Sequence, residues 1–473
     1  MENKKFYITT SIPYTNTPPH VGFALEIIQA DVLARYHRAL GEDVFFLTGT
    51  DEHGIKTLRV ARQAGKEPKL FADEVSEKFR ELTKVLNISN DDFIRTTDET
   101  RHKPAVESLW KKLDKRGDIY KKKYKGLYCS GCEAFKTSKE IVNGKCPLHQ
   151  KELELIEEEN YFFRLSKYTE EIKKLIENGK LKIIPETRKN EILAMLKEGL
   201  EDISFSRTKD KYWGFEVPGD PEQVMYVWCD ALPNYLSGIG YYDNPKKFKR
   251  YWPADVHCIG KDIVKFHTII WPAMLLSAGL DLPKTVFVHG FITVNGQKMS
   301  KSLGNVIDPF ELVKKYGADV VRYYLLREIV PIEDGDFTYE KFNQRYNSDL
   351  AGGIGNLVAR VLGIARKLNI KEASPTQKTS EKTKEIKNNY TRLVENFKFN
   401  EALASVWELI GFCDKYINEE KLWETKDPKV INDLFFALQQ IGNLLLPFLP
   451  QTAGKILEQL ETKKSEPLFP RLG

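Results

Sequence analysis

Hydrophobic and polar positions near the N-terminus follow the order expected for a strand, a helix and a second strand. Residues 6–10, FYITT, form a short apolar run that predicts a buried strand. Apolar residues then recur at helical spacing through EIIQADVLARYHRAL, and Gly41 follows where a helix C-terminus is expected. The next apolar run, DVFFLTGT, ends in the polar residues DEHG. This order predicts a βαβ unit, in which parallel strands are joined by a right-handed crossover.

The later pattern divides the chain into further segments. Residues 116–222 are rich in charge and interrupt the alternation, which indicates an insertion. Alternation resumes afterwards, and helical spacing dominates from residue 346 onward. We expect five segments, with an α/β domain split into two halves, an insertion, a linking segment and a helical domain, at residues 1–115, 223–310, 116–222, 311–345 and 346–473. The expected fold class is therefore α/β, with a Rossmann-like parallel sheet followed by an all-α bundle.

One stretch of the helical region lacks apolar spacing. Residues 371–385, KEASPTQKTSEKTKE, are polar and contain proline, serine and threonine. Such a composition is typical of a turn or loop. We therefore expect a surface loop between two helices here.

Composition narrows the class of protein. The 473 residues are 41% hydrophobic and 29% charged, which is ordinary for a globular protein of two to four domains. No run of 18 apolar residues occurs, so we expect no membrane span. The first residues, MENKKFYITT, lack the apolar core of a signal peptide, and we expect a cytoplasmic protein. The net charge of +5 is too small to indicate nucleic-acid binding by itself, and the basic run KKKYK at 121–125 is typical of a solvated surface.

A cysteine cluster lies within the expected insertion. Cys129-x-x-Cys132 is followed by Cys146-x-x-His149. In a reducing compartment this spacing favours a metal over a disulfide, and three thiolates with one imidazole are a tetrahedral Zn²⁺ ligand set. Because all four positions are filled by protein, we expect one structural Zn²⁺ per chain and no hydrolytic role.

Two further motifs follow apolar strands. His20-Val-Gly22-Phe23 lies where the first helix begins, and helix N-termini bind anions through their unpaired N–H groups. Taken alone, it is more typical of an ordinary helix cap with a surface histidine. The string Lys298-Met-Ser300-Lys301-Ser follows a strand and an Asn-Gly turn. Two lysines and hydroxyl groups can bind a polyphosphate, and the two motifs together predict a nucleoside triphosphate site.

These motifs resemble the HIGH and KMSKS signatures of class I aminoacyl-tRNA synthetases. Further strings resemble the methionyl branch of that family, and they span most of the chain in the family's order: SIPYTN, TGTDEHG, VWCDALPNY, GKDIVKFHTIIWPAML, HGFITVNGQKMSKSLGN and DFTYEKF. The chain departs from the first signature in one position, because Phe23 stands where the second histidine is expected. His20 would then carry more of the stabilisation of the phosphates.

The resemblance implies a function and a set of site residues. It implies attachment of methionine to tRNA(Met) at the expense of ATP, with Mg²⁺ as the cofactor that accompanies ATP. The reaction would pass through methionyl-adenylate, with His20, Lys298 and Lys301 catalytic. Gly22, Phe23 and Ser300 would complete the ATP site. The methionine site would comprise Ile12, Tyr14, Asp51, Trp228, Ala231, Tyr235, Ile263 and His267. By the same resemblance, Asp51 would bind the methionine ammonium group, while the Tyr235 hydroxyl and the Ile12 N–H would face the sulfur. Without it, the aromatic and isoleucine positions would be read as core residues.

The helical C-terminal part resembles the family's anticodon-binding domain. The resemblance implies that Trp423 stacks on an anticodon base and that Asn347 and Arg360 take part in reading it. Taken alone, Trp423 would be read as a core anchor. Because the chain ends at PLFPRLG, without the further dimerising module of some family members, we expect a monomer, a separate tRNA-binding protein acting in trans, or a shortened chain.

Two other functions remain open at this stage. One is a synthetase for leucine, isoleucine, valine or cysteine, which shares both signatures, although the insertion is too short for the large editing domain of the branched-chain enzymes. The other is a tRNA-binding paralogue without catalytic activity. Phe23 is the feature that favours the paralogue, and the intact KMSKS string with Asp51 speaks against it.

Overall fold

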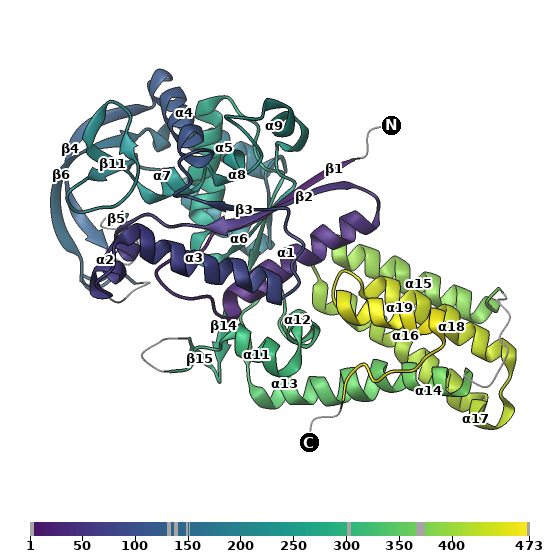
Figure 1. Ribbon diagram of the computed structural model, residues 1–473. Helices are drawn as coiled ribbons and strands as arrows, with labels where there is room; N and C mark the ends of the chain where they lie inside the picture. The colour runs from purple at the N-terminus through teal and green to yellow at the C-terminus, as the bar shows by residue number, and fades with distance from the viewer. Residues whose placement is uncertain are drawn as a thin grey trace. The chain divides into compact units, whose positions relative to one another are not determined.

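The computed structural model describes residues 4–129, 134–136, 141–147, 150, 152–299, 304–365 and 374–470. The chain folds into two compact units, each built from separate stretches of sequence (Figure 1). Unit 1 comprises Met1–Pro19, Glu42–Glu81 and Asn90–Val288. Unit 2 comprises His20–Gly41, Leu82–Ser89 and His289–Gly473.

A six-stranded sheet forms the centre of unit 1, with strand order β3-β2-β1-β12-β13-β7. Strands β1, β2 and β3 are labelled in Figure 1. Its strands are β1 (Lys5–Thr10), β2 (Asp43–Thr50), β3 (Asp92–Arg95), β7 (Lys182–Ile184), β12 (Val256–Gly260) and β13 (Thr285–His289). β1 pairs in parallel with both β2 and β12, in a register that places Tyr7 beside Phe45 and Ile8 beside Val256. The α/β class and the parallel sheet predicted from the sequence are confirmed.

The strand order places a topological switch point between β1 and β12. From β1 the chain proceeds to β2 and β3 on one side, whereas β12 leads to β13 on the other. In such sheets ligands bind outside the carboxyl ends of the strands at the switch point. The N–H of Ser11 donates to the carbonyl of Cys258 (2.9 Å), so the segments that leave β1 and β12 are held together there.

Short helices cover this sheet. Those that begin in unit 1 are α2 (Ile55–Gln63), α3 (Pro68–Val85), α4 (His102–Lys115), α5 (Thr169–Glu177), α6 (Glu186–Glu198), α7 (Val227–Ala231), α8 (Asn234–Ser237), α9 (Pro245–Tyr251) and α10 (Trp271–Ala278). Three further turns are η2 (Leu165–Tyr168), η3 (Lys261–Ile263) and the π-helical η4 (Phe266–Ile270). The core they enclose includes fully buried Tyr7, Tyr235 and Trp271.

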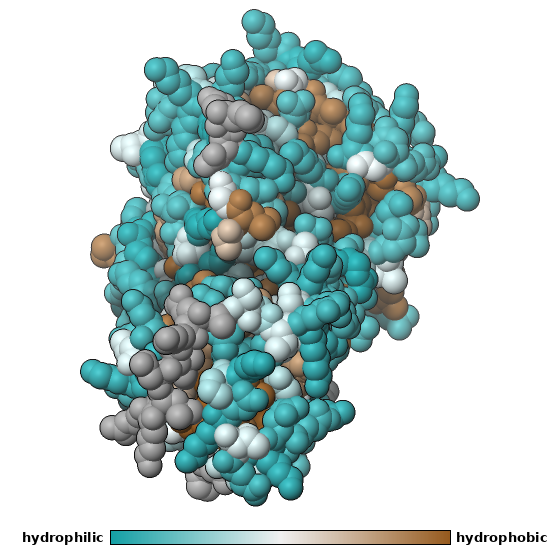
Figure 2. Space-filling view, turned by 90° about the vertical axis from the view of Figure 1, so that its right-hand side faces the viewer, coloured by the Kyte–Doolittle hydropathy of each residue, from teal (hydrophilic) through white to brown (hydrophobic). Residues whose placement is uncertain are grey.

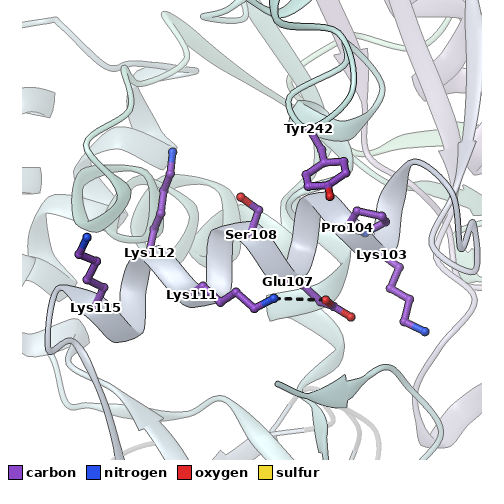
Figure 3. Close-up of a pocket in the computed structure, with 8 residues that line it drawn as sticks. All are labelled: Lys103, Pro104, Glu107, Ser108, Lys111, Lys112, Lys115 and Tyr242. Atoms are coloured by element: carbon purple, nitrogen blue, oxygen red, sulfur yellow. Dashed lines mark ion pairs between the residues drawn. The ribbon is translucent and has the colours of Figure 1, made fainter. Parts of the chain in front are cut away.

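Helix α4 has two contrasting faces. Its inner face buries His102, Val106, Leu109 and Leu113. Its outer face lines a hollow of about 480 Å³ (Figure 3), whose residues are Lys103, Pro104, Glu107, Ser108, Lys111, Lys112, Lys115 and Tyr242. This division follows from helical spacing, which places residues three and four positions apart on the same face.

The stretch expected as an insertion contains its own antiparallel sheet. Strands β4 (Ile119–Cys129), β5 (Ala134–Lys136), β6 (Glu154–Phe163) and β8 (Ile203–Ser204) pair in the order β5-β4-β6-β8. A second small sheet consists of β9 (Ser206–Thr208), β10 (Glu216–Val217) and β11 (Asp220–Met225). The same stretch also supplies β7, which pairs with β13 in the central sheet. The sequence interpretation did not anticipate that strand, because three residues are too few for a periodic signal.

The basic run on β4 faces an acidic run on β6. In the antiparallel register Lys123 lies opposite Glu159, and Lys125 lies opposite Glu157. Lys125 Nζ lies 3.3 Å from the Glu157 carboxylate. Opposite charges on facing positions stabilise such a ribbon, and they leave this run with little net positive charge.

Unit 2 combines α1 (Val21–Ala39) with the C-terminal part of the chain (Figure 1). A small sheet contains β14 (Ile292–Val294), β15 (Gln297–Lys298) and β16 (Gly335–Phe337). The helices are α11 (Pro309–Tyr316), α12 (Ala318–Arg327), α13 (Tyr339–Arg345), η6 (Tyr346–Gly355), α14 (Asn356–Ala365), α15 (Gln377–Glu395), α16 (Phe399–Glu419), α17 (Leu422–Thr425), α18 (Pro428–Leu445) and α19 (Pro450–Thr462). α15, α16, α18 and α19 pack into the predicted helical bundle.

The prediction of a surface loop at residues 371–385 is wrong over most of its described length. Helix α15 begins at Gln377, and residues 371–373 lie outside the described part of the chain. Thr379, Thr383 and Ile386 are buried at helical spacing, and Asp433 accepts hydrogen bonds from the hydroxyls of Thr376 (2.5 Å) and Thr379 (2.9 Å). The buried threonines were mistaken for loop residues because their partner is distant in sequence.

Hydrophilic side chains cover most of the face seen in Figure 2, with smaller hydrophobic areas among them. Among the described residues, no helix is both long enough and apolar enough to cross a membrane.

Candidate active site

His20 caps the helix that begins the first motif. It is the N-cap residue of α1, and its Nδ1 accepts a hydrogen bond from the N–H of Gly22 (3.1 Å). Burial lowers the pKa of His20, so the ring is neutral at pH 7. Because Nδ1 of a neutral ring is then the acceptor, the proton resides on Nε2, which can donate to a ligand.

Gly22 permits this cap. A Cβ at position 22 would lie 2.9 Å from Cε1 and 3.0 Å from Nδ1 of His20, closer than side chains normally approach. The same Cβ would lie 3.6 Å from Cε of Met299, the second residue of the KMSKS string. The N–H of Val21 also donates to the carbonyl of Ile307 (3.2 Å). The structure therefore brings Met299 and Ile307 to the N-terminus of α1.

A tight hairpin presents the KMSKS string. β14 and β15 are joined by Asn295 and Gly296, which both adopt positive φ, 51° and 73°. Such values are typical of a type I′ turn, and Asn-Gly is the preferred sequence for it. Asp336 accepts from the N–H of Gly296 and from the hydroxyl of Thr293, both at 2.7 Å, and fixes the turn. Lys298 is exposed, while Ser300 and Lys301 lie outside the described residues.

Predicted methionine-site residues meet in unit 1 at the carboxyl ends of β1 and β2. Tyr14 and Asp51 form an isolated parallel bridge, in which the N–H of Thr15 donates to the carbonyl of Asp51 (3.0 Å). The Tyr14 ring packs edge-on against Trp228, with centroids 6.4 Å apart. Lys56 Nζ lies 4.4 Å from the centre of the Tyr14 ring. Ile12 is half-buried on the same segment.

The far side of this site is aromatic. The Tyr235 hydroxyl lies 2.8 Å from Nε2 of His267, whose Nδ1 lies 3.0 Å from the carbonyl of Ile263. Trp228 stacks on Phe266, with centroids 3.7 Å apart and planes inclined by 8°. Ala231 lies on α7 with Trp228 and is buried. The sequence motif contained Phe266, but nothing in its spacing distinguished it from the neighbouring core residues.

The comparisons with known proteins agree with this arrangement. Residues 6–154 and 136–362 match the family "tRNA synthetases class I (M)", and residues 377–470 match "Anticodon-binding domain of tRNA ligase". A methionine–tRNA ligase of Thermotoga maritima is 47% identical over 96% of this chain and 75% of its own length. One of Brucella suis is 43% identical over 97% of this chain and 92% of its own. The chain belongs to the methionine–tRNA ligase family.

A solved structure extends the family likeness to the fold. The methionyl-tRNA synthetase of Mycobacterium tuberculosis, in complex with methionyl-adenylate, matches with a TM-score of 0.91 and 39% identity. The match covers 96% of this chain and 93% of that one. A sequence this similar over nearly its whole length leaves the alternative amino-acid specificities without support.

Two of the four predicted zinc ligands lie in the described part of the chain. Cys129 ends β4 and Cys146 follows a turn in which Val142 and Lys145 exchange backbone hydrogen bonds (3.1 and 3.0 Å). Both cysteines are fully buried. Cys132 and His149 lie outside the described residues. Within the described ranges no group of three or more metal-binding side chains is found.

The three predicted anticodon residues occur in separate elements of unit 2. Asn347 lies exposed on η6. Arg360 on α14 contacts Asp414 (3.2 Å) and Asn418 (3.1 Å) of α16. Trp423 on α17 is 50% exposed, and its Nε1 donates to Glu424. That exposure rules out the reading of Trp423 as a core anchor.

The hollow on α4 is distinct from the predicted site residues. None of its lining residues belongs to the predicted ATP, methionine, zinc or anticodon sets (Figure 3). Lys111 pairs with Glu107 across one turn at 3.6 Å, and Lys112 lies over the Tyr241 ring. These contacts are typical of a solvated helix face.

Proposed function

We propose that this chain activates methionine with ATP and transfers it to the terminal adenosine of tRNA(Met). The observation that carries the proposal is the meeting of the His20 segment with the segment of the KMSKS hairpin at the N-terminus of α1. A helix N-terminus with a histidine donor on one side and lysines on the other is suited to a triphosphate.

The first step requires positioning and charge stabilisation. The carboxylate of methionine attacks the α-phosphorus of ATP, the bond to the bridging oxygen breaks, and pyrophosphate leaves with methionyl-adenylate formed. The substrate is already a nucleophile, so no protein base is needed. His20 Nε2–H and the N-terminus of α1 stabilise the phosphate oxygens, while Lys298 and Lys301 neutralise the charge of the leaving pyrophosphate and Ser300 donates a hydrogen bond to it. Mg²⁺ bound to ATP would neutralise part of the charge on its phosphates.

Phe23 has a specific consequence in this scheme. It is buried on α1, where the signature has a second histidine. An apolar ring cannot donate a hydrogen bond to a phosphate. His20 and Gly22 are therefore the residues of this motif that can offer polar groups to the phosphates.

The methionine site combines one charged end with an apolar end. Asp51 accepts from the ammonium group, and Tyr14 lies beside it. Trp228, Ala231 and Ile263 surround the side chain, which suits a polarisable thioether. The Tyr235 hydroxyl and the Ile12 N–H approach the sulfur, and the His267 contact orients the Tyr235 hydroxyl.

Transfer to tRNA completes the reaction. The ribose hydroxyl of the terminal adenosine attacks the adenylate carbonyl, and AMP leaves. In the helical bundle Trp423 offers an exposed ring on which an unstacked anticodon base can stack, with Asn347 and Arg360 as polar partners. The enzyme acts in the cytoplasm as a monomer, with a tRNA-binding protein in trans as the alternative.

Cys129, Cys132, Cys146 and His149 would hold one structural Zn²⁺. The fully buried thiols of Cys129 and Cys146 fit a soft cation. The turn at Asn143–Gly144, with φ of 51° and 74°, suits a zinc knuckle. The ion would cross-link the end of β4 to this turn. Elemental analysis of protein expressed with zinc should give one equivalent, and Cys146→Ser should abolish it.

Methionine-dependent pyrophosphate exchange tests the proposed function. Exchange should occur with methionine and not with leucine, isoleucine, valine or cysteine, and total tRNA should be charged with labelled methionine. Lys301→Ala should slow exchange by about 100-fold or more with little change in methionine affinity. Tight tRNA binding without any exchange would instead identify a paralogue that has lost catalysis.

A further inference from the structure

A buried carboxylate lies between two histidines beside the methionine site. Asp230 Oδ2 lies 2.5 Å from Nδ1 of His53, and Oδ1 lies 3.2 Å from Nε2 of His102. Asp230 and His102 are fully buried, and His53 is 4% exposed. None of the three belongs to the predicted ATP, methionine, zinc or anticodon sets, and the proposed mechanism does not use them.

The cluster connects the segments that carry the methionine-site residues. His53 follows Asp51 by two positions at the carboxyl end of β2. Asp230 lies on α7 between Trp228 and Ala231. His102, at the start of α4, also contacts the Ser237 hydroxyl at 2.9 Å, and Ser237 lies on α8 with Tyr235. One hydrogen-bonded cluster thus reaches all three segments.

These segments need external support. α7 spans Val227–Ala231 and α8 spans Asn234–Ser237, each little more than one turn. Helices this short have no stability of their own, because nucleation costs more than the few hydrogen bonds return. Their orientation must therefore come from tertiary contacts, and a charge-assisted hydrogen bond in a buried site is among the strongest available.

The Asp230 carboxyl is charged in this cluster. Burial alone would raise the pKa of Asp230, but the two imidazoles outweigh it and hold that pKa below its ordinary value. The carboxylate is therefore ionised and accepts from both rings. Trp213 and Phe215 lie edge-on to the His53 ring, at 4.9 and 4.7 Å between centroids, and shield the contact from water.

We infer that His53, Asp230 and His102 are positioning residues that hold the methionine site in its binding geometry and thereby set the affinity for methionine. The inference rests on the proposed function. It predicts that weakening the cluster raises the KM for methionine and leaves the KM for ATP unchanged, since the His20 segment and the KMSKS hairpin belong to the other unit.

Paired substitutions at His53 test this role. Asn places an amide N–H where Nδ1 of histidine lies, whereas Ala has no donor. His53→Ala should raise the KM for methionine about 10-fold, which corresponds to one lost hydrogen bond. His53→Asn should recover most of that loss, and isothermal titration with methionine alone should give the same ratio.

Asp118→Asn is the matched control. Asp118 is another buried carboxylate of unit 1, and it accepts from Lys167 (2.6 Å) and Ser277 (2.7 Å). Its loss should lower the melting temperature without changing either KM. If His53→Ala and Asp118→Asn shift the KM for methionine equally, or if His53→Ala shifts neither, the inference is wrong. If His53→Ala does not fold, an unchanged KM in Asp230→Asn overturns it equally. Absence of methionine-dependent exchange in the unmodified protein would overturn the proposed function instead.

Discussion

The contact between Gly22 and His20 places a steric requirement on the first motif. The φ of Gly22 is not in the left-handed region, so the backbone alone would accept another residue. The constraint comes from the His20 ring, which lies where a Cβ would project. A methyl group at position 22 would therefore displace the side chain of His20, to which we assign a catalytic role in the proposed function.

Gly22→Ala should lower the rate of pyrophosphate exchange. The added methyl displaces the His20 ring, so the Nε2–H donor is misaligned, and loss of one such donor costs about 100-fold. The KM for methionine should not change. Gly411→Ala on α16 is the control, because nothing lies within 4 Å of a Cβ there, and it should leave exchange intact. Normal exchange by Gly22→Ala would show that the ring position is not required.

Trp423→Ala should raise the KM for tRNA and leave exchange unchanged. The ring is half exposed, so its removal costs little folding free energy, while loss of base stacking weakens binding by about 1–3 kcal/mol. Trp407 provides the contrast, because its Nε1 donates to the carbonyl of Asp349 and its ring packs on Tyr323. Trp407→Ala should lower the melting temperature. A matching loss of stability in Trp423→Ala would contradict the tRNA-binding role.

At the scale of elements, a buried ion pair joins α1 to α12. Arg322 is fully buried, and its Nη1 lies 2.7 Å from Asp31. Its other nitrogens donate to the carbonyls of Phe448 (2.7 Å) and Pro447 (3.0 Å), which precede α19. Ser89 donates to Asp31 through its N–H and its hydroxyl. One guanidinium thus ties the helix of the first motif to the helical bundle.

Asp31→Asn should destabilise the protein by about 3–5 kcal/mol, because it leaves a buried guanidinium unpaired. Burial alone would raise the pKa of Asp31, but Arg322, Arg35 and Ser89 hold it below the ordinary value. A carboxyl whose folded pKa is lowered stabilises above its unfolded pKa of about 3.9, and that stability is lost as pH falls further. The free energy of unfolding, measured in urea from pH 6 to 3, should therefore fall less steeply for Asp31→Asn than for the unmodified protein. Parallel curves would contradict this assignment.

Local pattern predicted these elements better than it predicted their partners. The pattern of residues 6–50 predicted β1, α1 and β2, because two short apolar runs, buried almost throughout, flank a longer stretch with apolar residues at helical spacing. It missed the burial of Thr379 in α15, because Asp433 lies 54 positions away. The His53–Asp230 contact spans 177 positions and left no local trace. The motifs predicted the site residues, whereas the contacts that orient their segments depend on the assembled fold.

At the scale of the whole molecule, both units are discontinuous in sequence. Unit 2 takes residues 20–41 from near the N-terminus, although most of it follows residue 289. α1 packs against α12, and α1 supplies Asp31 to Arg322. Residues 289–473 are therefore not an independent domain.

A fragment consisting of residues 289–473 should not fold cooperatively. Without α1, the fragment exposes the surface of α12 that α1 covers in the full chain. It also leaves the buried charge of Arg322 without its partner Asp31. Its circular dichroism should melt over a broad range, and the full chain should show a sharp transition. A sharp, native-like melt of the fragment would contradict the dependence on α1.

The early position of α1 has a consequence during synthesis. A ribosome completes this helix long before it reaches residue 289, and domains generally fold as units when their last segment emerges. Nearly every side of α1 is buried in the finished protein, from Val21 and Phe23 to Tyr36. The nascent chain must therefore carry an exposed apolar helix through most of translation, which makes it a natural client for chaperones.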